Sequence, residues 1–128
     1  GGDVDFSMFK EDDDSEHFFA LVFAKTEGSA TTIKETISDY NTQYHSSENL
    51  RITNSFIDKD HQIVIVRSFD NKADAQRYYN GFYADDELLK DINSQNYDKF
   101  VITTKNFTVL FRNKNTDVYK AFFEAKYQ

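Results

Sequence analysis

The sequence contains no cysteine, which excludes disulfides, thiol catalysis, zinc–thiolate sites and iron–sulfur clusters. It contains no proline either, which excludes a proline-rich ligand segment or a proline-stiffened linker. There are only four glycines, and no Walker loop, G-x-G-x-x-G, G-x-S-x-G or H-E-x-x-H motif occurs. With so few glycines, loops that cradle phosphate groups are nearly excluded, and we expect no cofactor.

Tryptophan is also absent, yet the 128 residues include 13 phenylalanines and eight tyrosines. Apolar residues make up 39% of the chain, which is enough for the core of one ordinary domain. A few bulky rings therefore have to fill most of that core. Eight tyrosines exceed what a small core usually holds. They either surround the core as amphipathic filler or present wet hydroxyls that suit a binding surface, and the sequence leaves both interpretations open.

The formal charge of −7 is unevenly distributed. Residues 1–16 carry seven acidic side chains and one lysine, whereas residues 17–128 are nearly neutral. A run such as Glu11-Asp12-Asp13-Asp14 repels itself, so residues 1–16 are predicted to form an acidic flexible leader ahead of a single domain at 17–128. Calcium-binding loops alternate their ligands with other residues and contain a turn glycine, and this acidic run has neither feature. Phe6, Met8 and Phe9 are the side chains through which the leader could dock.

The nearly neutral remainder has no basic patch, so we expect no binding to nucleic acid or to an anionic membrane surface. The longest apolar run, about Phe18–Ala24, is far too short for a transmembrane segment. Since the chain begins Gly1-Gly2 rather than with methionine, we interpret it as a piece of a longer protein.

Hydropathy patterns and turn residues predict an alternation of strands and helices. The predicted strands cover residues 17–25, 50–57, 62–69 and 97–104; the predicted helices cover 31–45 and 71–83, with a further turn or two at 87–92 and a helical tail over 106–127. Thr32, with Glu35 at capping-box spacing, Asn71 and Asn106 are the residues predicted to cap three of the helices.

The resulting order is β-α-β-β-α-β, so the predicted fold class is α+β, a ferredoxin-like antiparallel sheet with a C-terminal helical extension. Right-handed crossovers give the strand order 4-1-3-2, with both main helices on one face. The first and third strands are apolar on both faces, as central strands should be, and the half-polar strand 50–57 suits an edge. We expect the aromatic tail to cover part of the other face.

Few residues have the spacing of a reactive site. His17, His45 and His61 lie at element boundaries without a second ligand nearby, so we expect exposed histidines and no metal site. Asp85-Asp86-Glu87 is more typical of helix capping than of acid–base catalysis. Arg67 interrupts the apolar strand 62–69 near its end, and we expect its charge to reach solvent or an acidic neighbour.

The segment from Ile63 to Ala75, which reads Ile-Val-Ile-Val-Arg-Ser-Phe-Asp-Asn-Lys-Ala-Asp-Ala, resembles the second half of SPOR domains. The order of elements is also similar. SPOR domains bind peptidoglycan glycan strands stripped of their peptides, using the open face of the sheet. This resemblance implies glycan binding as one candidate function.

A closer similarity covers about residues 17–127. It is carried by Ile-Val-Arg-Ser-Phe-x-Asn-Lys (65–72), Tyr-Tyr-Asn (78–80), Phe-Val-Ile-Thr (100–103) and a closing Tyr-x-x-Phe-Phe (119–123). These motifs are similar to the C-terminal module of tetratricopeptide-repeat proteins in Bacteroidetes cell envelopes, including gliding-motility and type IX secretion lipoproteins. The resemblance implies a periplasmic or outer-membrane-associated assembly factor that is not an enzyme.

Together, these observations predict a non-catalytic interaction domain that binds a protein partner in the envelope. We expect binding by strand addition at the edge strand 50–57 or by docking on the sheet face, through Arg51, Thr53, Ser55 and Arg67. The alternative partner is the peptidoglycan glycan. An enzyme on the same scaffold would instead require a concave pocket with converging titratable groups.

Overall fold

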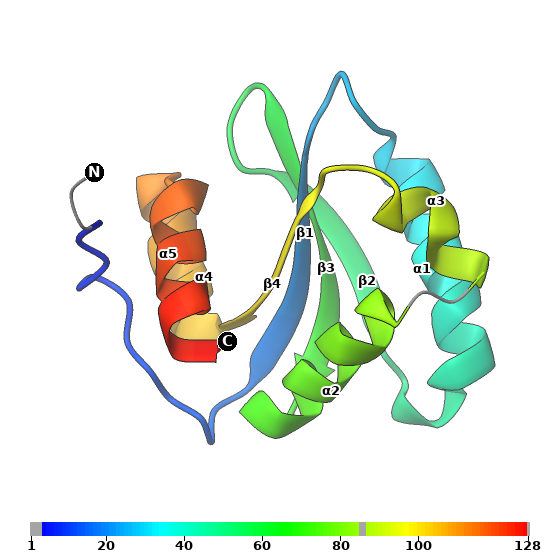
Figure 1. Ribbon diagram of the computed structural model, residues 1–128, viewed down its shortest axis with the longest axis horizontal. Helices are drawn as coiled ribbons and strands as arrows, with labels where there is room; N and C mark the ends of the chain where they lie inside the picture. Colours follow the sequence, from blue (N-terminus) through cyan, green and yellow to red (C-terminus); the bar gives the residue numbers. More distant parts are fainter. Residues whose placement is uncertain (1–3, 85–86, 128) are drawn as a thin grey trace.

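The computed structural model describes residues 4–84 and 87–127, which form an α+β fold with a four-stranded antiparallel sheet (Figure 1). The strands are β1 (His17–Ala24), β2 (Arg51–Phe56), β3 (His61–Phe69) and β4 (Asp98–Thr103). The α-helices are α1 (Ala30–Tyr44), α2 (Lys72–Tyr83), α3 (Lys90–Asn93), α4 (Thr104–Asn113) and α5 (Thr116–Tyr127), and short 3₁₀ helices cover Ser46–Glu48 and Glu87–Leu89.

The sheet order is β2-β3-β1-β4, which is 4-1-3-2 when counted from the β4 edge. The two central strands are β1 and β3, and they are the strands whose apolar residues are buried on both faces. Strand β2 lies at an edge and is mostly exposed, as its half-polar sequence predicts. Apolar content therefore identifies the position of each of these three strands in the sheet.

Helices α1 and α2 lie side by side on one face of the sheet. The rings of Tyr40 in α1 and Tyr78 in α2 have centroids 6.1 Å apart, and Tyr78 lies 5.2 Å from Phe19 of β1. The predicted cap Asn71 is confirmed, because its side chain accepts a hydrogen bond from the backbone of Asp74. The predicted cap Thr32 is wrong: α1 begins three residues earlier, where Ser29 is the cap.

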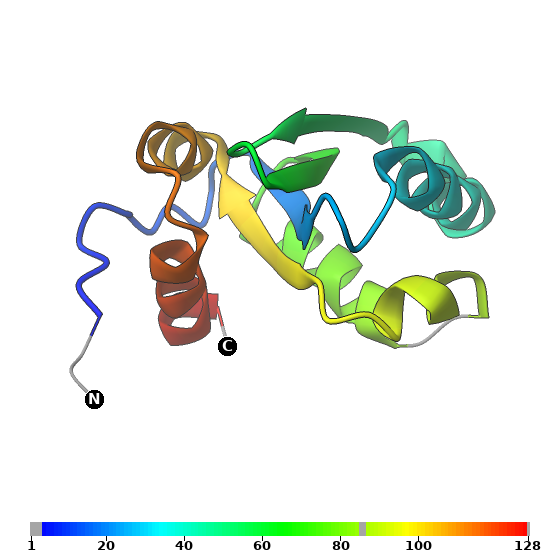
Figure 2. The same ribbon diagram turned by 90° about the horizontal axis from the view of Figure 1, so that it is seen from above.

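The two helices of the C-terminal tail cover different parts of the sheet (Figure 2). Helix α4 packs on the face opposite to α1 and α2, where Phe107 meets Phe18 edge-to-face at 5.6 Å. Helix α5 lies against β4, and the Tyr119 hydroxyl donates a 2.6 Å hydrogen bond to the Val101 carbonyl. The cap of α4 is Thr103 and not the predicted Asn106.

The segment ahead of β1 packs on these two helices. Phe9 is buried and meets Tyr119 edge-to-face at 4.9 Å, whereas Met8 is 41% exposed. The side chain of Asn106 accepts from the backbone N–H of Lys10 at 3.0 Å and donates to its carbonyl at 2.7 Å. Phe9 therefore docks the leader on the folded domain, as the sequence analysis considered. The acidic run lies between this contact and β1.

Replacing the buried ring tests whether this segment is part of the packed core. We expect Phe9→Ala to lower the free energy of unfolding by about 3 kcal/mol, because a buried phenylalanine is removed and a cavity remains. The control Met8→Ala removes an exposed side chain and should change it by less than about 0.5 kcal/mol. Urea unfolding of the two variants measures both values. Equal, small effects would mean that the segment does not pack on α4 and α5 in solution.

Candidate functional site

The four predicted contact residues lie on one face of the sheet, beside α4. In the β2–β3 register, Arg51 pairs with Arg67, and Thr53 and Ser55 pair with isoleucines of β3. Because side chains alternate between faces, these residues share the face that α1 and α2 leave free. Arg51, Thr53 and Ser55 are exposed and Arg67 is half-buried, so the structure brings the predicted set together on an accessible surface.

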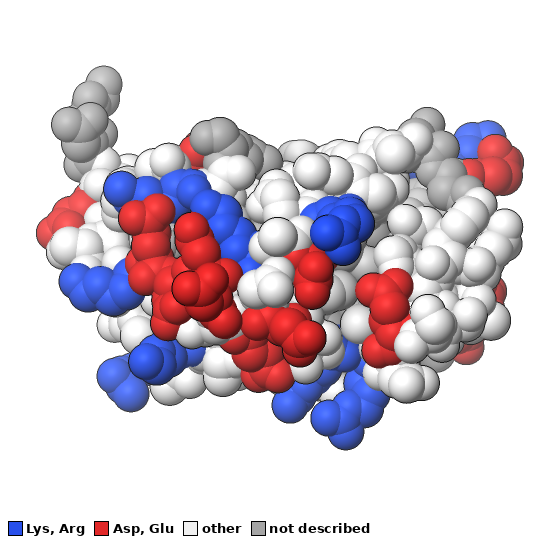
Figure 3. All heavy atoms as spheres, turned by 90° about the horizontal axis from the view of Figure 1, so that it is seen from below, with Lys and Arg blue, Asp and Glu red and all other residues white. Residues whose placement is uncertain are grey.

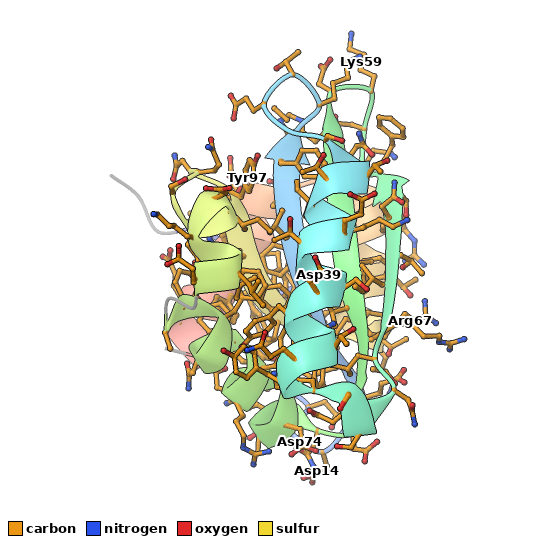
Figure 4. All side chains as sticks on the ribbon, turned by 90° about the vertical axis from the view of Figure 1, so that its right-hand side faces the viewer. Asp14, Asp39, Lys59, Arg67, Asp74 and Tyr97 are labelled. Atoms are coloured by element: carbon orange, nitrogen blue, oxygen red, sulfur yellow. The ribbon has the colours of Figure 1, made fainter. Side chains whose placement is uncertain are left out.

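Arg67 lies within β3, which continues to Phe69. Its guanidinium carbon lies 5.1 Å from the centroid of the Phe18 ring, a cation–π distance, and Figure 4 shows the side chain beside β2, at the edge of the sheet away from α2. Hydrogen bonds from Ser68 and Thr104, with a smaller contribution from the Arg67 charge, hold the pKa of the Glu16 carboxyl below its usual value. The charge of Arg67 thus has both an aromatic and an acidic neighbour.

The outer edge of β2 offers backbone groups in a fixed pattern. In the β2–β3 hairpin the Ile57 N–H donates to the His61 carbonyl at 3.0 Å, so this pair is hydrogen-bonded. The register is unbroken through β2, so bonded and non-bonded pairs alternate from there. The N–H groups of Thr53 and Ser55 therefore point toward β3, and those of Ile52, Asn54 and Phe56 point outward. This distinction between neighbouring residues cannot be made without the register.

The two edges of the sheet differ in what covers them. At β4, α5 packs against the edge and the Tyr119 hydroxyl bonds the Val101 carbonyl. At β2, no further strand pairs with the outer edge within residues 4–84 and 87–127. Natural proteins usually shield such edges, since unpaired backbone groups can accept another strand. The accessible edge thus adjoins the surface formed by Arg51, Thr53, Ser55 and Arg67.

His17 contradicts the expectation of exposed histidines. Its side chain is fully buried, because α5 and the preceding segment cover the start of β1. A carbonyl can only accept, so Nδ1–H donates to the Ser15 carbonyl at 2.8 Å, and Nε2 accepts from the Tyr127 hydroxyl at 2.8 Å. His45 pairs with Glu48, and the more exposed His61 pairs with Asp58 at 3.0 Å.

Acidic side chains gather at the end of the molecule where the leader meets α2 (Figure 3). Asp14 and Asp74 lie at this end in Figure 4, and Asp13 is 3.6 Å from the ammonium of Lys72. In the described part of the chain, no group of three or more acidic or histidine side chains is arranged to hold a metal ion. Of the acidic triplet noted in the sequence, Asp85 and Asp86 lie outside the described residues, and Glu87 begins a 3₁₀ helix.

The tyrosines divide between the two interpretations that the sequence left open. Tyr78 and Tyr119 are almost completely buried and serve the core, whereas Tyr44 and Tyr83 are 49% and 47% exposed. Burial raises the pKa of the Tyr127 hydroxyl to about 12. Tyrosine therefore has both roles in this molecule.

A cleft between α2, β4 and α5 was not anticipated from the sequence. Its volume is about 200 Å³, and Tyr79, Tyr83, Tyr97, Lys99, Lys120 and Phe123 are among the residues that line it. Lys99 is only 9% exposed, and burial lowers the pKa of its ammonium. The tyrosine-rich end of α2 is visible in the sequence, but its proximity to Lys99 depends on how α2 crosses β4.

The burial of His17 has a consequence for stability. Desolvation lowers the pKa of its imidazole below the usual 6.5, so the neutral form is favoured in the folded protein. Below about pH 6.5 the unfolded chain takes up a proton that the folded chain does not, so the free energy of unfolding should decrease as the pH falls through this value.

An NMR titration of the three imidazole rings measures this directly. We expect the midpoint of His17 to lie below 6.5, and His17→Gln to lose less stability than the wild type between pH 8 and pH 5.5. His61→Gln, which removes an exposed histidine, is the matched control and should keep the decrease in stability that is due to His17. A His17 midpoint above 6.5 would contradict the buried neutral tautomer.

Comparison with known proteins finds no matching family model, no matching curated protein and no matching solved structure. Within the described ranges, no helix is long and apolar enough to cross a membrane.

Proposed function

We propose that this chain is a non-catalytic interaction domain whose protein partner adds an extended segment to the outer edge of β2. The observation that carries the proposal is the difference between the two sheet edges, since β4 is shielded by α5 and β2 pairs with no further strand among the described residues. Strand addition uses such an edge: backbone hydrogen bonds supply affinity, and alternate side chains supply specificity.

The side chains beside this edge favour a particular kind of segment. Arg51 and Arg67 lie directly across from each other, and like charges in a cross-strand pair repel. An acidic side chain of the added strand, beside Arg51 on the same face, would offset that repulsion. Thr53 and Ser55 add exposed hydroxyls on the same face. The partner segment is therefore extended and acidic where it passes Arg51.

We also propose that the fold is ferredoxin-like and the module SPOR-like, as found at the end of envelope repeat proteins, with a periplasmic or outer-membrane-associated location. The β-α-β-β-α-β order with α1 and α2 on one face supports this assignment. SPOR domains bind glycan on the open sheet face, and here α4 occupies part of that face. The position of α4 therefore supports a protein partner over the alternative, the peptidoglycan glycan.

A proline in β2 tests strand addition without disturbing the fold. Asn54→Pro removes an outward-pointing N–H and leaves the ladder to β3 intact, which an edge strand tolerates. We expect it to reduce at least tenfold the retention of the partner captured from envelope extract by the immobilised domain. Mass spectrometry identifies and quantifies that partner.

Asn54→Ala is the matched control, because it keeps the N–H and removes the side chain that Lys34 and Gln62 contact. It should retain the partner within about twofold, while Arg51→Glu should weaken retention. Retention of the same protein by Asn54→Pro at the wild-type level would refute strand addition. Cosedimentation of both Asn54→Pro and the wild-type protein with peptide-stripped peptidoglycan would favour the glycan instead.

A further inference from the structure

The cleft between α2, β4 and α5 is walled by aromatic rings. Tyr79 lies 4.9 Å from Tyr83 and 5.2 Å from Phe123, measured between ring centroids. Tyr97 is held at the same cleft by a 2.9 Å hydrogen bond from its hydroxyl to the Glu27 carbonyl. At about 200 Å³ the space is smaller than the roughly 300–1,000 Å³ of pockets for drug-sized molecules. It suits a ligand the size of a single flat ring.

Lys99 lines the cleft, and its ammonium lies 4.7 Å from the centroid of the Tyr83 ring. The residue as a whole is 9% exposed, yet no hydrogen bond or ion pair joins this ammonium to another residue in the described part of the chain. A lysine ammonium has three N–H donors, and partial burial makes its charge less stable where no acceptor pairs with it. The cation–π contact satisfies only part of this requirement.

The nearest carboxylate is already engaged. Asp98 forms a 2.8 Å ion pair with Lys120 at the cleft, and hydrogen bonding to Asp98 raises the pKa of the Lys120 ammonium. Glu124 also lines the cleft and is exposed to solvent. Lys99 is thus a cation at an aromatic cleft whose adjacent acid is bound to a different lysine.

We propose that this cleft binds a small carboxylate attached to a flat apolar ring, with Lys99 contacting the carboxylate and Tyr83, Tyr97 and Phe123 packing on the ring. The carboxylate supplies the acceptor that the Lys99 ammonium lacks, through a charge-assisted hydrogen bond. This site lies at the β4 side of the sheet and is separate from the surface beside β2, so it is independent of strand addition.

Benzoate is a suitable probe, and benzyl alcohol is its uncharged counterpart of similar shape. In an NMR titration of the whole chain, we expect benzoate to cause saturable shifts at Tyr83, Tyr97 and Phe123, with an affinity at least fivefold higher than that of benzyl alcohol. Lys99→Met keeps the aliphatic stem and removes the charge, so it should abolish this preference. Lys59→Met, at the exposed hairpin tip, should leave it unchanged.

A second measurement does not depend on the variant. Reductive methylation with ¹³C labels each lysine, and benzoate should shift the Lys99 resonance while leaving that of Lys59 in place. Equal affinity for benzoate and benzyl alcohol in the wild type, or a benzoate response that does not involve Lys99, would overturn the proposal.

Discussion

The hydrogen bond from the Tyr119 hydroxyl to the Val101 carbonyl is the interaction on which the arrangement of this molecule depends. A carbonyl on a sheet edge must be satisfied when it is buried, because an unpaired buried acceptor costs about 1–3 kcal/mol. Once Tyr119 supplies the donor, α5 can pack against β4 and exclude solvent from that edge. The same ring then forms the surface on which Phe9 is buried.

The segment ahead of β1 and the C-terminal helices pack together around Tyr119. Helix α4 leads directly from β4 to the opposite face of the sheet, and Asn106 near its start binds the backbone of Lys10. Lys114, which follows α4, reaches the Ile57 carbonyl at the β2–β3 hairpin with a 2.8 Å hydrogen bond. The tail therefore shields the β4 edge and part of one face, and leaves β2 as the accessible strand. The proposed binding surface is the part of the sheet, at β2, that the tail does not cover.

The sequence predicts those features that depend on local pattern. Apolar runs identify the central strands, and alternation places Thr53 and Ser55 on one face. The predicted caps Thr32 and Asn106 each lie three residues after the true cap, and the cause is the same in both helices. Thr32 and Asn106 donate their backbone N–H to the true caps, Ser29 and Thr103, and both residues of each pair are good capping types. Sequence alone does not separate them.

Features that join distant segments could not be predicted. The burial of His17 depends on Tyr127, which lies 110 positions away in the sequence. The proximity of Lys99 to Tyr83 likewise depends on how α2 crosses β4. These are tertiary contacts between residues whose local sequence is typical of a boundary histidine and an exposed lysine.

Hydrogen exchange of two backbone amides tests the difference between the edges most directly. The Thr104 N–H donates to the Glu16 carbonyl, so hydrogen-bonded and non-hydrogen-bonded pairs alternate along β1 and β4 from that pair. The Val101 amide therefore points outward at the β4 edge, as the Asn54 amide does at the β2 edge. We expect the Asn54 amide of the isolated protein to exchange at least about 100-fold faster than that of Val101, which is buried under α5. Equal protection of the two amides would contradict this expectation, because the β2 edge would then already be covered.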